Sequence, residues 1–200
     1  MYFFLLSYPI LGAGIKFIDD AFDEKRFNVN IAYILAPILG VLWAYSMVIN
    51  SASATILLAI LLGVLLKGKI DNYAHLAGIG IIFAILIISG VNILIIPLII
   101  LTLSAIFDEV GNDFIDKHKY LNSNKILQKF IGYFFDQRWL TKVAVLSIAV
   151  IGIIPLYFFL AMILFDGAYL LVRGISNTKT ILPKVVDTVE EEDRITSYDI

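Results

Sequence analysis

The sequence predicts an all-α integral membrane protein, a bundle of about seven transmembrane helices with one amphipathic helix at the membrane interface. Of its 200 residues, 60% are hydrophobic and 16% are charged, and the mean hydropathy is +0.91. A water-soluble chain carries about 25% charged residues, so this chain has too little polar sequence to cover a soluble globule. Its apolar runs do not alternate with polar residues as barrel strands do, which leaves helices to satisfy the backbone in lipid.

Five apolar segments and one longer run provide the predicted spans. A span needs about 20 apolar residues, and we expect helices at Tyr2–Ile18, Val29–Ile49, Ser51–Leu66, Ala74–Val91 and Asn92–Phe107. The run Val143–Val172 is too long for one ordinary span. Pro155 divides it, because proline removes a backbone donor and clashes with the preceding turn. The run therefore predicts either one kinked helix or two short ones.

The segment Lys125–Leu140 predicts a different kind of helix. Aliphatic and aromatic side chains recur at helical spacing from Ile126 to Phe135, accompanied by Lys129, Asp136 and other charged residues. Such a pattern is typical of a helix that lies in the plane of the membrane interface. Aromatic residues also favour that depth.

The positions of the basic residues predict the orientation. They follow the first, third and fifth predicted spans and recur in the tail: Lys25, Arg26, Lys67, Lys69, Lys117, Lys119, Lys125, Lys129, Arg138, Lys142, Arg173, Lys179, Lys184 and Arg194. The connections near Asn50 and Asn92 carry no charge. With seven spans all these residues fall on the cytoplasmic side, the N-terminus lies outside, and residues 177–200 form a polar, acidic cytoplasmic tail after a membrane domain of residues 1–176. Six spans would place the tail outside.

The acidic residues gather on the same predicted face and suggest a metal site. Those after the first and fifth spans are Asp19, Asp20, Asp23, Asp108, Glu109, Asp113 and Asp116. If the helices continue, Asp19 and Asp23 lie one turn apart, and the later acids form one stripe. Like charges at such spacing destabilise a helix, and desolvation near a bilayer adds to the cost. Because oxygen ligands suit hard cations, the pattern predicts bound Mg²⁺.

A simpler interpretation is that these acids are loop charges paired with nearby basic residues. Asp71 follows the third span and is a further candidate. Asp166 is the most informative acid, because a carboxylate inside an apolar helix must be paired or functional; Arg173 is its candidate partner. His75 would either contact a phosphate or lie at the start of the fourth span. The chain has no cysteine and no HExxH, GxxxxGK(S/T) or GxSxG pattern, so thiolate, zinc-protease, P-loop and hydrolase sites are not predicted.

A Mg²⁺-loaded face above an apolar bundle suits a lipid phosphate or an allylic diphosphate. The metal would stabilise the diphosphate as a leaving group, and the bundle would hold the hydrocarbon chain. The expected phosphate-binding residues are Lys25, Arg26, Lys67, Lys69 and Lys117. We expect a membrane lipid or prenyl compound as the partner and no nucleic acid. The sequence assigns no catalytic residue and no oligomeric state.

Two of the acidic segments carry a resemblance to a known family. Gly12–Asn28, with the sequence GAGIKFIDDAFDEKRFN, resembles the first aspartate-rich motif of the UbiA-type intramembrane prenyltransferases, and Asp108–Asp116 loosely resembles their second. The resemblance implies a helical bundle that binds Mg²⁺ and a prenyl diphosphate at the cytoplasmic side. The chain departs from the family because Ile18 stands where an asparagine usually begins the motif. The motif also follows the first span instead of the second, and the chain is about two spans shorter.

Two other classes of function fit the same sequence. In an ion- or proton-coupled transporter or channel, Asp166 and Asp20 would be the ion sites. No acid falls at the centre of a predicted span, however, and no paired broken helices are evident apart from Pro97 and Pro155. A non-catalytic membrane subunit would need only the topology.

Overall fold

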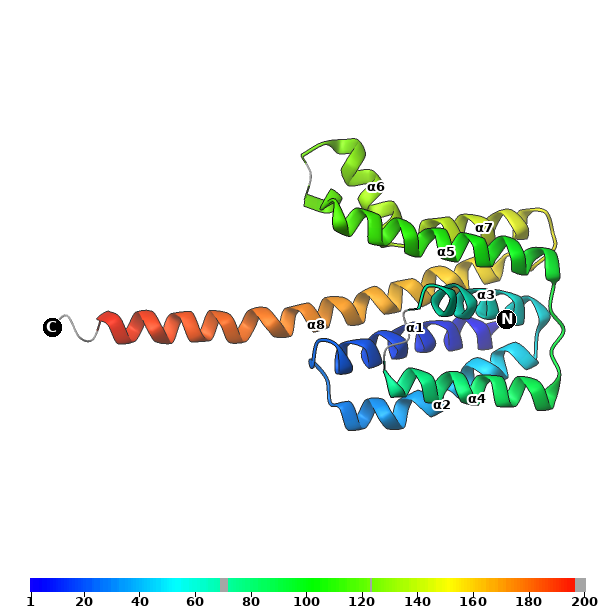
Figure 1. The fold of residues 1–200 in the computed structure, drawn as a ribbon, viewed down its shortest axis with the longest axis horizontal. Helices are drawn as coiled ribbons and strands as arrows, with labels where there is room; N and C mark the ends of the chain where they lie inside the picture. The colour runs from blue at the N-terminus through cyan, green and yellow to red at the C-terminus, as the bar shows by residue number, and fades with distance from the viewer. Residues whose placement is uncertain (69–71, 123, 197–200) are drawn as a thin grey trace.

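The computed structural model describes residues 1–68, 72–122 and 124–196, with side chains followed as far as residue 178. In this part of the chain every regular element is helical (Figure 1). The elements are α1 (Tyr2–Phe22), α2 (Val29–Val48), α3 (Ser51–Leu66), α4 (Tyr73–Ser89), α5 (Ile95–Lys117), η1 (Tyr120–Asn122), α6 (Ile126–Asp136), α7 (Trp139–Val150) and α8 (Tyr157–Thr196). The all-α prediction is therefore confirmed.

Four helices are long and apolar enough to cross a membrane: α1, α2, α5 and the segment Tyr157–Thr178 of α8. The helices α3, α4 and α7 are apolar but shorter, at 16, 17 and 12 residues. The membrane character predicted from composition is thus supported, whereas the count of seven spans stays a prediction.

Two helices extend beyond their predicted ends, and this extension decides where the acidic residues lie. α1 continues past Ile18 to Phe22, and α5 continues past Phe107 to Lys117. Both acidic clusters are therefore on helices, as the predicted i, i+4 spacing requires. The amphipathic helix α6 ends earlier than expected, at Asp136, because Arg138 adopts a left-handed backbone with φ of +50° and begins a new helix.

The long run Val143–Val172 belongs to two helices, which decides between the two alternatives that Pro155 left open. α7 ends at Val150 and α8 begins at Tyr157. Gly152 has φ of +84° in the turn between them, a conformation that residues with a Cβ rarely adopt. α8 continues past residue 177, where a separate tail was expected, and its backbone is helical to Thr196. Figure 1 shows its end projecting well beyond the bundle.

The apolar helices run back and forth along one direction, and α6 crosses that direction at one end (Figure 1). α1 packs along α8 so closely that a Cβ on Gly12 would lie 2.1 Å from the carbonyl oxygen of Phe165. Tyr8 and Phe158 are fully buried between these two helices. The hydroxyl of Tyr8 lies 3.1 Å from that of Ser53 on α3. A glycine contact, aromatic packing and one buried hydrogen bond therefore join the elements that surround the candidate site.

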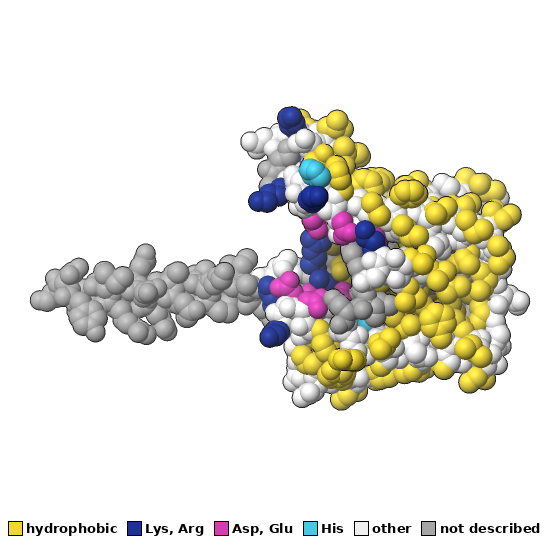
Figure 2. All heavy atoms as spheres, viewed as in Figure 1, with side chains coloured by type: hydrophobic (Ala, Val, Ile, Leu, Met, Phe, Trp, Pro, Cys, Tyr) yellow, Lys and Arg dark blue, Asp and Glu magenta, His cyan; other side chains and the backbone are white. Residues whose placement is uncertain are grey.

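The outer surface divides sharply into apolar and charged regions (Figure 2). Hydrophobic side chains cover the face of the bundle in this view, and charged side chains gather in a hollow at the end where α6 lies. Exposed residues on the apolar surface include Ile87 and Ile88, at 81% and 85% exposure. An apolar surface of this extent requires a lipid environment or a covering partner.

Candidate functional site

The charged end of the bundle forms because the connections at one end contain the charged residues. The segments 23–28, 67–68 and 118–125 lie at this end, and the connections 49–50, 90–94 and 151–156 at the other end contain no charged residue. The candidate site lies where α1, α4, α5, α8 and the junction of α6 with α7 meet at the charged end.

The larger of two cavities at this end is apolar along most of its wall. It encloses about 550 Å³, which is the size of a ligand cleft. Its apolar lining includes Ile15, Ile18, Leu39, Trp43, Ile60, Leu61, Val64, Ile79, Ile82 and Phe165. Its polar lining consists of Asp19, Asp23, His75, Glu109, Asn112, Arg138 and Tyr169. The indole N–H of Trp43 is buried and has no hydrogen-bond partner within the described residues. We call this space the amphipathic cavity.

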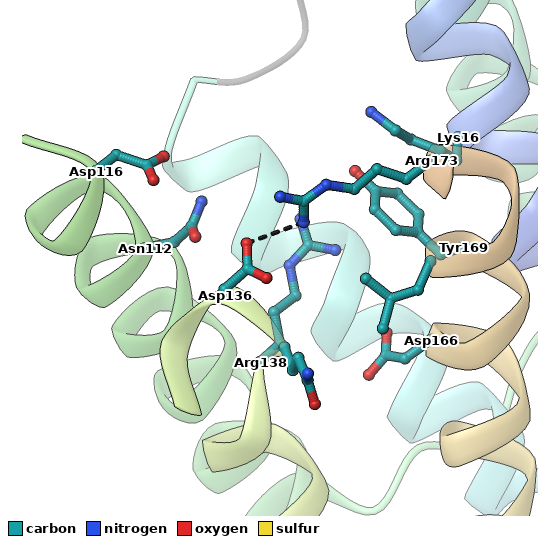
Figure 3. Close-up of a pocket in the computed structure, with 10 residues that line it drawn as sticks. Lys16, Asn112, Asp116, Asp136, Arg138, Asp166, Tyr169 and Arg173 are labelled. Carbon is teal, nitrogen blue, oxygen red and sulfur yellow. Dashed lines mark hydrogen bonds and ion pairs between the residues drawn. The ribbon is translucent and has the colours of Figure 1, made fainter. Parts of the chain in front are cut away.

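The smaller cavity is almost entirely polar (Figure 3). It encloses about 180 Å³ and is lined by Lys16, Asn112, Asp116, Asp136, Gln137, Arg138, Asp166, Tyr169, Leu170 and Arg173. Asn112, Arg138 and Tyr169 also line the amphipathic cavity. We call this space the polar pocket. A polar molecule in it would lie next to the polar end of whatever occupies the larger cavity.

Arg138 is the central residue of the site. Its Nη2 lies 2.9 Å from Oε1 of Glu109, which is buried on α5, and its guanidinium lies 5.3 Å from the ring centre of Tyr169. Burial alone would lower the pKa of Arg138, but the charge of Glu109, with smaller contributions from Tyr169, Asp166 and Asp19, holds it above its usual value. The guanidinium therefore stays charged between the two cavities.

Asp166 and Arg173 do not pair with each other. Nζ of Lys142 lies 2.6 Å from Oδ2 of Asp166 and also donates to the carbonyl of Gln137. Arg173 instead donates from Nη1 to Oδ1 of Asp136, at 2.9 Å (Figure 3). The candidate Asp166–Arg173 pair does not form, because Asp166 and Arg173 each bind a partner from the segment between Asp136 and Lys142. The prediction that Asp166 must be paired or functional agrees with the buried ion pair.

Asp108 stabilises the start of α7. Its Oδ1 accepts from the backbone N–H of Leu140 at 3.1 Å, and its Oδ2 accepts from the N–H and the hydroxyl of Thr141, both at 2.7 Å. The first N–H groups of a helix lack partners inside the helix, and Arg138 at the N-cap position supplies no side-chain cap. A carboxylate from α5 therefore performs the capping that usually comes from the adjacent residue.

Most of the other acids predicted as metal ligands have basic partners. Asp20 lies 2.8 Å from Lys16, and Asp113 lies 2.8 Å from Lys67. Asp19 lies 2.6 Å from Nε2 of His75; the N-cap of α4 is Asn72, which accepts from the backbone N–H of His75. Thus His75 holds a carboxylate at the wall of the amphipathic cavity.

Asp23 lines the amphipathic cavity, and Asp116 lines the polar pocket. Within the residues that the structure describes, no three His, Asp or Glu side chains form a group able to hold a metal ion. Asp19, Asp20, Glu109 and Asp113 therefore have the ion pairs of the simpler interpretation, and Mg²⁺ binding stays a prediction. Asp71 and Lys69 lie outside the described residues.

The cations that line the cavities differ from those predicted to bind phosphate. Arg26 contacts Glu24 and the carbonyl of Ser176, and Lys25 and Lys117 are exposed. Lys25, Arg26, Lys67 and Lys117 are absent from the lining of both cavities. The cations in the lining are instead Arg138, in both cavities, and Lys16 and Arg173, in the polar pocket. Tyr169 and Arg138 line both cavities, although they were not among the site residues predicted from the sequence. Their positions in the sequence carry a signal that could have identified them. Tyr169 follows Asp166 by one helical turn, and Arg138 separates two apolar segments.

No protein-family model matches the chain, and no curated protein or solved structure matches it. The resemblance to the UbiA-type prenyltransferases therefore rests on the two aspartate-rich segments alone.

Replacing Asp108 by Ala should destabilise the protein by about 2–4 kcal/mol, because three donors at the start of α7 lose their acceptor. Asp108→Asn keeps one acceptor oxygen and should cost less. Unfolding in mixed detergent, followed by circular dichroism, provides the measurement. Asp113→Ala on the same helix is the control, because its half-exposed pair with Lys67 contributes less than about 1 kcal/mol. Equal losses for Asp108→Ala and Asp113→Ala would contradict the capping role.

Proposed function

We propose that the protein binds a lipid phosphate or prenyl diphosphate, with its hydrocarbon chain in the amphipathic cavity and its phosphate beside Arg138. The observation that carries this proposal is the change in the cavity lining from apolar side chains to charged ones. A molecule with the same division of polarity would satisfy both regions.

We further propose that the chain crosses the membrane seven times, with the charged end in the cytoplasm. The proposal is supported by the back-and-forth course of the seven apolar helices and by the uncharged connections at the opposite end. The three shorter helices, α3, α4 and α7, span about 18–26 Å at 1.5 Å per residue. This is less than the thickness of the hydrocarbon core of a bilayer. The apolar residues next to each helix would therefore complete the crossing. α6 would lie in the interface, because Ile126, Leu127 and Phe130 are exposed along it.

Single cysteines test this topology, since the natural chain has none. Ser51→Cys and Asn92→Cys should react with a membrane-impermeant maleimide added outside intact cells. Lys25→Cys and Lys117→Cys should react only after the membrane is opened, because the bilayer separates the two ends. Labelling of the Lys25 and Ser51 positions from the same side would contradict the seven-span topology.

The phosphate would bind to Arg138, which lines both cavities. Its planar guanidinium is suited to phosphate oxygens. Mg²⁺ would enter with a diphosphate and neutralise its oxygens. Asp19 and Asp23 are carboxylates in the lining that could take part. Asp19 would then have to exchange its contact with His75 for the metal.

Prenyl transfer is the narrower form of this proposal, and it is supported by the resemblance of Gly12–Asn28 and Asp108–Asp116 to the family motifs. The same cavity would also serve a protein that binds or moves a lipid phosphate without transferring it.

The transporter alternative depends mainly on Asp166, which is held by Lys142 in a buried pair. Ion flux through the reconstituted protein that is lost in Asp166→Asn would favour transport over lipid binding.

The double variant Arg138→Gln/Glu109→Gln tests the head-group site without leaving an unpaired buried charge. We expect its affinity for farnesyl diphosphate, with Mg²⁺ present, to fall about tenfold or more, because a charge-assisted contact to phosphate is lost. Farnesol, which has the same chain and no phosphate, should bind both proteins alike. Binding in detergent by isothermal titration calorimetry gives both values. Equal affinity of the two proteins for the diphosphate would overturn the proposed head-group site.

A further inference from the structure

The polar pocket has charges of opposite sign on opposite walls (Figure 3). Asp116 and Asn112 come from α5 on one side, and Lys16 and Arg173 come from α1 and α8 on the other. Asp116 is exposed and has no ion-pair partner within the described residues. A ligand in this pocket would therefore meet an acceptor at one end and cationic donors at the other.

The lining as a whole is balanced in charge, which limits the kind of ligand that it can hold. Three of the lining residues are basic and three are acidic. Each charged residue of the lining except Asp116 already has an ion-pair partner within the described residues: Arg173 pairs with Asp136, Lys142 with Asp166, Lys16 with Asp20 and Arg138 with Glu109. A multivalent anion would be repelled by Asp116, whereas Lys16 and Arg173 each keep N–H donors that their single carboxylate contacts do not use. A molecule with one charge of each sign would have favourable contacts on both walls.

The pocket also limits the size of the ligand. A volume of about 180 Å³ corresponds to about six water molecules at 30 Å³ each. Leu170 is the single aliphatic residue in the lining, so the pocket offers little to a hydrocarbon chain. A compact, water-soluble molecule of about six or seven non-hydrogen atoms fits this space.

We infer that the polar pocket is a binding site for a small zwitterion, with its ammonium group toward Asp116 and its anionic group toward Lys16 and Arg173. The site is separate from the proposed lipid site but adjoins it, because Asn112, Arg138 and Tyr169 line both cavities. The two ligands would thus lie on either side of Arg138.

Four probes of similar size test the inference on the full-length protein in detergent. L-Serine is a zwitterion, ethanolamine lacks the carboxylate, D-glycerate lacks the ammonium and glycerol lacks both charges. We expect L-serine to bind with Kd of about 1 mM or tighter, and about tenfold more tightly than the others, because each charged contact contributes at least that factor. Isothermal titration calorimetry measures the four affinities.

Two variants separate the two ends of the pocket. Asp116→Asn should weaken L-serine binding about tenfold and leave D-glycerate binding no weaker. Arg173→Gln/Asp136→Asn, which removes the ion pair without leaving Asp136 unpaired, should weaken L-serine binding and leave ethanolamine binding unchanged. Asp113→Asn is the matched control for Asp116→Asn, because it lies one turn away on α5 and is absent from the pocket lining. We expect it to bind L-serine as the natural chain does.

The inference is overturned if D-glycerate or glycerol binds as tightly as L-serine, if L-serine does not bind, or if Asp113→Asn has the same effect as Asp116→Asn. Farnesyl diphosphate binding, measured on the same preparation, distinguishes this failure from failure of the proposed function. Diphosphate binding without L-serine binding overturns the zwitterion site alone. L-Serine binding without diphosphate binding overturns the lipid proposal alone.

Discussion

A guanidinium held between a buried carboxylate and an aromatic ring is the contact on which the charged end of this protein depends. Arg138 joins Glu109 of α5 to Tyr169 of α8 and lines both cavities. In a membrane protein a buried charge is tolerated only when it is paired, and removing one partner of such a pair costs about 3–5 kcal/mol. The same requirement explains why Lys142 binds Asp166 and Lys16 binds Asp20.

The segment from Asp136 to Lys142 contributes one residue to each of three ion pairs around the site. Asp136 binds Arg173, Arg138 binds Glu109, and Lys142 binds Asp166, while Asp108 caps the helix that begins within the segment. The short junction between α6 and α7 is therefore fixed to both α5 and α8. Because this junction forms part of the wall of the polar pocket and Arg138 reaches the amphipathic cavity, a change in the position of α6 would alter the site.

The parts of the fold that follow from bilayer physics could be predicted from the sequence. The apolar helices, the uncharged connections and the division at Pro155 all follow from the cost of placing polar groups in lipid. The pairing of Asp166 could also be anticipated, but its partner could not, since Lys142 comes from another helix. Likewise, the acceptor that caps α7 lies 32 and 33 residues earlier in the chain than the donors it binds. Spacing along one helix predicts neighbours on that helix and gives no information on contacts between helices.

The same reasoning explains why Lys25, Arg26, Lys67 and Lys117, which the sequence predicts to bind phosphate, are absent from the linings of both cavities. Lys25 and Lys117 lie close in sequence to the acidic clusters, yet both are exposed outside the two linings. Arg138 lies far in sequence from the first acidic cluster, and the packing of α5 against α7 brings it to the cavity. Its left-handed backbone conformation at φ of +50° has a cost that surrounding contacts must offset, and the pair with Glu109 is one such contact.

Native mass spectrometry of the protein extracted gently from its own membranes tests the central claim most directly. If the amphipathic cavity holds a lipid phosphate beside Arg138, each chain should retain one phosphate-bearing lipid. The Arg138→Gln/Glu109→Gln protein, prepared in the same way, should lose it. Retention of the same lipid by both proteins, or binding of neutral lipids alone, would contradict the account.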